Sequence, residues 1–467
     1  LCVAVDLRDR DEAILGTTVQ PEAVRASAAC AVQNLWLAAR AEGIGLGWVS
    51  IVEPAVLRAE LALPRGVEPV AYLCLGHPRA FRNRPMLDET GWATRRPLAE
   101  VVHRDRFPAA ATSAQPHTHD TASAQAASTA RQTTLVKPIG SLGRLEELAA
   151  RYAGARRVHP APIPERAAIA IFAADHGVAA EGVSAYGSST TAAVVGTIMT
   201  GGAAINTLAQ QNVIELALVD VGVAGDLSAL PRAPLIPLDR RAICAGTRNL
   251  VREPALTRDE VTAAMAVGSA TAHRLIDEGA DLLGVGEVGI ANTTAAAALT
   301  SIFTGQPPMA TVGRGTGLDE SGVARKAFLI EAALARAGLD RTAGSDPLRV
   351  LAEVGGLEIA AMVGFLRAAH SRHRLVVLDG FVTNAAALVA QAFTPDLVDN
   401  LVASHRSAER GAALALDALG LTPLFDLQLR LGEGTGAALA MALVRSAVAL
   451  EVNMATFATA GIWPPPR

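Results

Sequence analysis

The stretch AAIAIFAADHG, residues 167–177, begins with a continuous apolar run and ends with an acid and a glycine. A run without polar alternation is typical of a strand that is buried on both faces, as in a parallel sheet covered by helices. Ala-rich amphipathic segments separate this run from three others of the same form. The alternation predicts an α/β fold with a doubly wound, mostly parallel sheet and helices on both faces. The other three runs are IELALV (214–219) before Asp220, ADLLGV (280–285) before Glu287 and RLVVL (374–378) before Asp379.

The acids that follow these four runs predict a site. In doubly wound sheets, ligands bind at the edge formed by the carboxyl ends of the strands. Asp and Gly are also ordinary turn formers, which is enough to explain each case singly. Because an acid and a glycine follow all four runs, we expect a shared site at this edge.

Composition and charge narrow the class of protein. A chain of 467 residues predicts two or three domains. The net charge of −4 and the lack of a basic run argue against nucleic acid or an anionic membrane as the partner. The four cysteines form no CxxC pair, which indicates a reduced, cytoplasmic protein without structural zinc. No uninterrupted apolar stretch reaches about 18 residues, so we expect no membrane span.

Residues 107–134 divide the chain into two parts. The segment is rich in Ala, Ser, Thr and Gln without apolar periodicity, so it predicts a flexible linker between domains at 1–106 and 135–467. In the first domain, we expect a helix, a glycine turn and a strand over 31–52, and a further strand over 69–76. HTHD (117–120) within the linker has metal-ligand residue types, but no partner ligands lie nearby, and we favour a chance cluster in a solvated segment.

Two Gly-rich segments carry candidate ligand-binding groups. In GVGEVGIANTTAAAALT (284–300), Glu287 supplies a carboxylate and Asn292 is a good cap for the helix that follows; an ordinary helix cap is the alternative. In GRGTGLDESGVARK (313–326), the GTG turn offers backbone N–H groups and a hydroxyl, and Lys326 is one of only two lysines in the chain. Glycines with one lysine are typical of a phosphate cradle, although no Walker A motif is present.

The third Gly-rich segment is RLGEGTGAALA (430–440), in which Glu433 stands between glycines before an apolar helix. Burial in such a turn raises the pKa of a carboxyl group towards neutrality, which suits a general base. The alternative is a capping carboxylate stabilised by the positive end of the helix. The residues alone leave both interpretations open.

Residues from about 135 to 462 resemble the nicotinate-nucleotide–dimethylbenzimidazole phosphoribosyltransferase family. The resemblance implies transfer of the phosphoribosyl group of nicotinate mononucleotide to 5,6-dimethylbenzimidazole, giving α-ribazole 5′-phosphate and nicotinate for the lower ligand of cobalamin. It also implies a homodimer and an enzyme that needs no metal or cofactor. The matching blocks are KPIGSLGRLE (137–146), ADHGV (174–178), GGAAIN (201–206), DVGVAGD (220–226), GEVGIANTTAAAA (286–298), GRGTGLD (313–319), DGFVTNAAALVA (379–390) and PLFDLQLRLGEGTGAALA (423–440).

The resemblance also implies roles for single residues. Glu433 matches the general base that takes the proton of the benzimidazole, and the glycines around it then give room for a flat aromatic base. Glu287 matches an acid that favours positive charge on the ribose. Ser184 and Ala193 match the benzimidazole pocket, where Ala193 replaces a glutamine. The positions implied for the phosphate and nucleotide are Lys326, Gly289, Gly315, Thr316, Gly317 and Asn292.

Residues 1 to about 106 resemble the second half of the flavin-dependent 5,6-dimethylbenzimidazole synthase, a nitroreductase-like family, through AVQNLWLAARAEGIGLGWVS (31–50), VAYLCLGHP (70–78) and GWATRRPL (91–98). This implies a partial α+β domain that contacts FMN through Gly45, Gly47 and Arg95. The product of a synthase is the substrate of the transferase, so the fusion supports dimethylbenzimidazole as acceptor.

Two other functions stay open at this level. One is a nucleotide-binding regulatory protein that has lost catalysis, suggested by the changed residues near the base pocket and the partial first domain. The other is a flavin-dependent oxidoreductase activity of the N-terminal part. Release of nicotinate from the two substrates distinguishes the transferase from the first alternative, and a protein without flavin absorbance even after reconstitution rules out the second.

Overall fold

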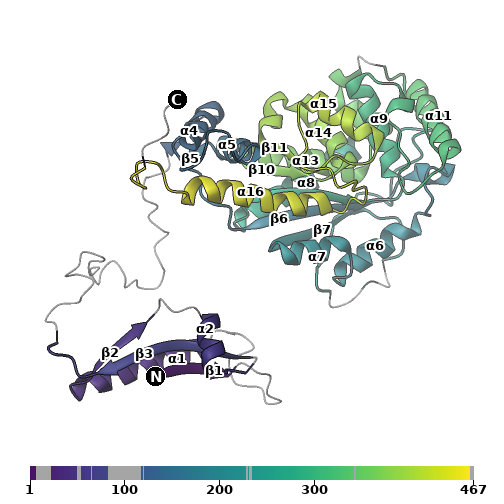
Figure 1. The fold of residues 1–467 in the computed structure, drawn as a ribbon. Coiled ribbons are helices and arrows are strands. Elements are labelled where there is room, and N and C mark those ends of the chain that lie inside the picture. The colour runs from purple at the N-terminus through teal and green to yellow at the C-terminus, as the bar shows by residue number, and fades with distance from the viewer. Residues whose placement is uncertain are drawn as a thin grey trace. The chain divides into compact units, whose positions relative to one another are not determined.

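The computed structural model divides into two compact units, Leu1–Ala110 and Ala111–Arg467, which we describe separately (Figure 1). The structure describes residues 1–6, 23–49, 54–64, 66–81, 117–118, 120–227, 230, 234–340 and 343–462.

The first unit has the predicted α+β character. Its antiparallel sheet has the order β1-β3-β2, from Cys2–Asp6, Val67–Gly76 and Gly45–Val49. Helix α1 (Ala23–Ala41) supplies buried apolar residues to a small core with the sheet, and α2 (Pro54–Glu60) follows β2. The predicted helix, turn and strand over 31–52 and the strand over 69–76 are confirmed for the residues that the structure describes.

The second unit is built on a six-stranded parallel sheet with the order β11-β10-β9-β6-β7-β8. The four predicted strands are all present, and two short strands extend the sheet at its edges. Numbered along the chain, the order is 3-2-1-4-5-6 when read from β8, with the direction of winding reversing between β6 and β9. The strands are β6 (Ala167–Ala174), β7 (Ile214–Gly222), β8 (Leu238–Arg240), β9 (Leu282–Val288), β10 (Leu375–Leu378) and β11 (Leu401–Ala403).

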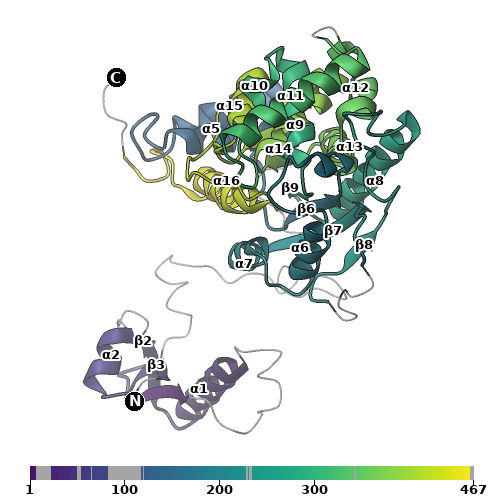
Figure 2. The ribbon, with the colours of Figure 1, turned by 90° about the vertical axis from the view of Figure 1, so that its right-hand side faces the viewer.

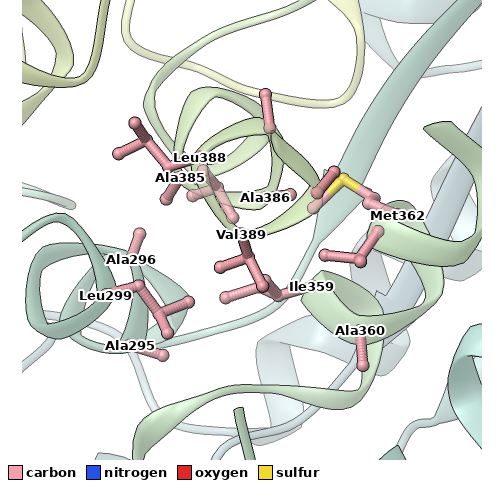
Figure 3. Close-up of a cluster of buried hydrophobic side chains, with 14 of the residues drawn as sticks. Ala295, Ala296, Leu299, Ile359, Ala360, Met362, Ala385, Ala386, Leu388 and Val389 are labelled. Atoms are coloured by element: carbon pink, nitrogen blue, oxygen red, sulfur yellow. The ribbon is translucent and has the colours of Figure 1, made fainter. Parts of the chain in front are cut away.

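Helices cover both faces of this sheet, as predicted (Figure 2). Alternate residues of β6 enter opposite cores: Phe172 belongs to one and Ile171 to the other. Small side chains let the helices of the first face approach closely, as Figure 3 shows for alanines of α9, α13 and α14. That face carries α8 (Arg258–Asp277), α9 (Asn292–Thr304), α13 (Leu357–Ser371) and α14 (Phe381–Phe393); the other carries α5 (Arg144–Arg156), α6 (Ser189–Met199), α7 (Ala204–Gln211) and α16 (Thr435–Asn453).

The second unit also contains other helices, strands and turns. They are β4 (His117–Thr118), α4 (Thr121–Gln132), β5 (Val158–His159), α10 (Pro308–Thr311), α11 (Glu320–Ala337), α12 (Pro347–Val354), α15 (Arg410–Leu419) and 3-10 turns at Gly177–Glu181, Ala343–Ser345 and Pro395–Asn400.

The prediction of a flexible linker over 107–134 is wrong for Thr121–Gln132, which forms α4. Asp120 caps this helix by accepting the Ser123 N–H at 2.7 Å, so the acid of the HTHD cluster has a structural role. One face of α4 is buried, and Ser128 donates to Glu451 of α16 at 2.7 Å. The buried residues recur every four positions, but they are Ala124, Ser128 and Gln132, whose small or polar side chains hide the helical period.

Among the residues that the structure describes, two apolar segments are long enough to span a bilayer by length and composition, Ser189–Gln211 and α16. In α16, 56% of the most apolar window is buried inside the protein. That burial is typical of a core helix. We therefore interpret α16 as a helix that covers the sheet.

Candidate active site

A cavity of about 660 Å³ lies at the carboxyl edge of the parallel sheet, where the strand order reverses. The end of β9 and the segment after it line the cavity from Glu287 to Thr293, and the loop before α16 lines it from Gln428 to Glu433. Further walls come from the turns after β10 and β11, from α6 and from the GRGTG segment. The position agrees with the predicted site at this edge.

Glu287 lies at the end of β9 and lines the cavity. Its carboxylate accepts a hydrogen bond from the Asn292 side-chain amide, which therefore orients the acid. Burial, together with the charge of Asp379, raises the pKa of Glu287 to about 8. Near neutral pH this carboxyl group carries a proton when the cavity is empty, and a cationic ligand beside it would favour the ionised form.

Glu433 occupies a strained turn. Gly432, Glu433 and Gly434 have φ values of 88°, 63° and 89°, a left-handed conformation that a glutamate rarely adopts. Glu433 lines the cavity, and its Oε2 is buried without a hydrogen-bond partner. Burial raises the pKa of the Glu433 carboxyl group, with a hydrogen bond from the Ile205 backbone opposing the shift. This is the environment predicted for a general base, at the start of the predicted helix.

Asp379 holds the Glu433 turn in place. One carboxylate oxygen accepts the Gly434 N–H at 3.0 Å, and the other accepts the N–H groups of Gly436 and Ala437 at 2.7 and 3.3 Å. Burial raises the pKa of this carboxyl group to about 7, although these three bonds oppose the shift. Asp379 therefore caps α16 and fixes the residue after the proposed base.

The other two acids at the strand ends bind backbone groups. Asp175 accepts the Ala224 N–H, and Asp220 accepts the N–H groups of Gly222 and Val223. Of the four acids, only Glu287 lines the cavity. The shared site exists, but the simple explanation by turn formation is correct only for Asp220, whose partners follow it directly in the chain. Asp175 and Asp379 accept N–H groups from distant segments instead.

Glycines bring the Glu433 turn against β9. A Cβ on Gly286 would lie 2.5 Å from the Gly434 backbone nitrogen, and one on Gly432 would lie 2.5 Å from Glu287 Oε1. The room that the sequence suggested for an aromatic ring is thus filled here by the strand and by the Glu287 carboxylate. These glycines set the distance between the two acids.

We predict that Gly286→Ala lowers kcat about 10- to 100-fold, because the added methyl group displaces the turn that carries Glu433 and small misplacements of a reacting group are costly. Steady-state kinetics of the reaction proposed below measures this. Gly187→Ala is the control, since its Cβ meets nothing within 4 Å. Equal kcat values for the two variants would contradict the positioning role.

The predicted phosphate cradle lies beside these acids. Gly315 and Thr316 line the cavity, whereas Gly317 faces a neighbouring one. Lys326 is fully buried, and its Nζ donates to Thr293 Oγ1, a cavity-lining hydroxyl, at 2.7 Å. Burial lowers the pKa of Lys326 to about 8. Lysine and glycine turn thus meet at one wall, as predicted, with Lys326 behind it rather than on its surface.

Only one of the two residues predicted for the base pocket lines the cavity. Ser184 lines the cavity and its hydroxyl lies 3.0 Å from Thr316 Oγ1, so the predicted base and phosphate walls touch. Ala193 lies on the exposed side of α6 and does not line the cavity. Thr190 and Val194, four residues apart on the helix, line it instead. The resemblance assigned Ala193 to the base pocket, but the structure does not place this residue at the cavity. The prediction for Ala193 therefore has no support from the structure.

The sequence interpretation missed the segment after β11. His405, Ser407 and Glu409 all line the cavity. Burial lowers the pKa of His405, which stacks on Phe425 with ring centroids 6.1 Å apart. The carboxyl-end rule would have found these residues had β11 been recognised, but a strand of three residues gives little signal.

The residues expected to contact flavin lie in the first unit. Gly45 and Gly47 lie on β2, paired with Gly76 and Cys74 of β3. Arg95 lies outside the described residues. The contact with FMN stays a prediction.

In the comparison with known proteins, family models match both parts of the chain. A family model described as phosphoribosyltransferase matches residues 117–462, and one described as the nitroreductase family matches residues 7–77. A nicotinate-nucleotide–dimethylbenzimidazole phosphoribosyltransferase from Chromobacterium violaceum is 48% identical over 73% of this chain and 96% of its own. The enzyme of the same name from Chloroflexus aggregans is 47% identical over 72% and 94%.

Solved structures agree. A crystal structure of nicotinate-nucleotide–dimethylbenzimidazole phosphoribosyltransferase from Thermus thermophilus is 44% identical, covers 73% of this chain and 99% of its own, and has a TM-score of 0.68. A second structure from the same organism, described as CobT, has 45% identity and a TM-score of 0.69 over the same shares.

Proposed function

Because the chain belongs to the phosphoribosyltransferase family, we propose that its second unit transfers the phosphoribosyl group of nicotinate mononucleotide to 5,6-dimethylbenzimidazole. The relatives carry this activity in their names and match almost their whole length. The observation that carries the proposal for this chain is one cavity that joins a strained, partly buried glutamate, a second acid and a glycine–lysine wall. The products are α-ribazole 5′-phosphate and nicotinate, for the lower ligand of cobalamin.

In this reaction Glu433 accepts the proton from one benzimidazole nitrogen, and the other nitrogen attacks the anomeric carbon with inversion. Nicotinate leaves as the C–N bond breaks, because its ring nitrogen is cationic while it is bonded to ribose. Glu287, ionised next to the cationic donor, stabilises the positive charge that develops on the ribose. Asn292 orients Glu287, and Asp379 holds the turn that carries Glu433.

Lys326 and the Gly315–Thr316 turn, with Gly289 nearby, bind the 5′-phosphate in this scheme. We predict that Lys326→Met raises the KM for nicotinate mononucleotide about 10- to 100-fold while kcat changes little, because the positive charge behind the phosphate wall is lost. In the unsubstituted protein the ammonium loses its proton as the pH rises through about 8, so the donor KM rises above that pH. Initial rates over a pH range from about 6.5 to about 9.5 measure both effects. The KM of the Lys326→Met variant should not rise with pH. A variant whose KM equals that of the unsubstituted protein would contradict the role of Lys326.

The experiment that tests the proposed function is a turnover assay of the full chain with nicotinate mononucleotide and a panel of benzimidazoles and purines. We expect release of nicotinate with formation of the α-ribotide, fastest for 5,6-dimethylbenzimidazole. Donor binding without turnover with any base would refute the proposal and favour a nucleotide-binding protein without catalysis.

The assembly and surroundings of the enzyme belong to the same proposal. We propose a cytoplasmic homodimer whose transferase reaction needs no cofactor and no metal, and whose substrates are small molecules rather than nucleic acid or membrane. For the first unit, reconstitution with FMN followed by an absorbance spectrum tests flavin binding.

A further inference from the structure

Glu409 lies between two cavities. It is the residue before α15, is 6% exposed, and lines both the active-site cavity and a neighbouring cavity of about 530 Å³. Its side chain does not cap its own helix. A buried carboxylate needs partners, so the groups that it contacts indicate its role.

Those groups belong to the proposed phosphate cradle. Oε1 accepts the Gly315 N–H at 2.8 Å, and a Cβ on Gly313 would overlap Oε2. Lys326 Nζ is 3.5 Å from the position of a Cβ on Gly315, so the ammonium lies behind the same glycine. The charge of Glu409 also favours the ionised form of Lys326. Without the donor, a carboxylate of the protein therefore uses the N–H that binds phosphate in our scheme and interacts electrostatically with the ammonium behind it.

Glu409 is incompletely held there. Its Oε2 is buried without a hydrogen-bond partner, which is costly for a carboxylate. The neighbouring cavity is lined by Arg314, Arg410 and Arg430, all exposed. Within the described part of the chain, none of these three arginines forms a side-chain hydrogen bond or an ion pair. Glu409 lines this neighbouring cavity as well, so positive charge lies on the side of the residue away from the cradle.

We propose that Glu409 is a displaceable carboxylate that occupies the phosphate cradle when the donor is absent and yields it to the 5′-phosphate, moving towards the arginines of the neighbouring cavity. The inference rests on the proposed function, since it takes the ligand to be a ribose 5′-phosphate. Two anions cannot share the Gly315 N–H, because like charges at that distance repel strongly. Donor binding therefore includes the cost of moving Glu409, and the apparent affinity is reduced by the fraction of molecules in which the cradle is occupied.

The test is isothermal calorimetry of the full chain with two ligands, nicotinate mononucleotide and nicotinate riboside, which lacks the phosphate. In Glu409→Gln the amide oxygen still accepts the Gly315 N–H, but the competing charge is gone. We expect the Kd for the mononucleotide to fall about three- to tenfold, because the phosphate displaces a neutral amide at a lower cost than a carboxylate. The Kd for the riboside should change less than about twofold, since it displaces nothing.

Arg410→Gln is the second variant, because Arg410 lines only the neighbouring cavity. It should raise the Kd for the mononucleotide about threefold in the unsubstituted background and leave it unchanged in Glu409→Gln, as expected when two residues act through one movement. Glu409→Gln binding that is weaker, or that shifts equally for both ligands, would show a fixed brace of the loop and overturn the inference alone. If the unsubstituted protein binds neither ligand, the proposed function fails together with it.

Discussion

Glu433→Gln is expected to lower kcat by about two to four orders of magnitude, the usual contribution of a positioned general base. Glutamine has the same shape, so the turn and its bond from Glu433 N to Glu287 O at 3.2 Å can persist. What disappears is the acceptor for the benzimidazole proton. The Kd for nicotinate mononucleotide should stay within about twofold, since the base does not hold the donor.

Single-turnover rates and donor binding measured on the same preparation separate these effects. Burial raises the pKa of Glu433, so the unsubstituted enzyme should lose activity on the acid side as this carboxylate takes up a proton. Glu433→Asp provides a matched control, because it keeps a base that is shorter by one methylene and should retain more activity than Glu433→Gln. A Gln variant with near-normal turnover would assign Glu433 to capping α16 instead.

The sequence predicted the central strands of the second unit well, because those strands are long and continuously apolar. It missed β8 and β11, which have three residues each and little hydrophobic signal. Helix α4 was missed for a different reason: its buried face is made of alanine and polar residues, and Ser128 on that face finds its partner far along the chain, at Glu451. Such long-range partners cannot be read from local periodicity.

In the candidate site, too, some features were predicted from the sequence and others were not. Glu433, Glu287 and the glycine turn at Gly315 were found because glycine clusters mark special backbone geometry. The partners of these groups were not found. That Asp379 fixes the Glu433 turn, or that Glu409 reaches Gly315 from 94 residues away, depends on how the strand ends converge in space.

Glu287 was predicted to be an acid that favours positive charge on the ribose, and its burial leads to a prediction with two opposite effects. We expect Glu287→Gln to lower kcat about 100- to 1,000-fold, because one preorganised charge at a developing ionic centre is worth that much. The same substitution should raise the melting temperature of the second unit. The unsubstituted carboxyl group is buried with a pKa of about 8, so ionising it in the folded protein is unfavourable.

The sign with pH follows from that raised pKa. A carboxyl group with a folded-state pKa above its ordinary value of 4.5 stabilises the fold fully below pH 4.5, and this contribution is lost as the pH rises to about 8. Glutamine lacks the ionisation, so the melting temperature of Glu287→Gln should exceed that of the unsubstituted protein more at about pH 8.5 than at about pH 5. Asp379 titrates in both proteins, and its repulsion of an ionised Glu287, which the variant lacks, adds to the difference at the higher pH. Differential scanning calorimetry of both proteins at the two pH values measures this difference in melting temperature. A melting-temperature difference that is the same at both would mean that Glu287 is already ionised in the empty site, and a variant with full turnover would remove Glu287 from the reaction.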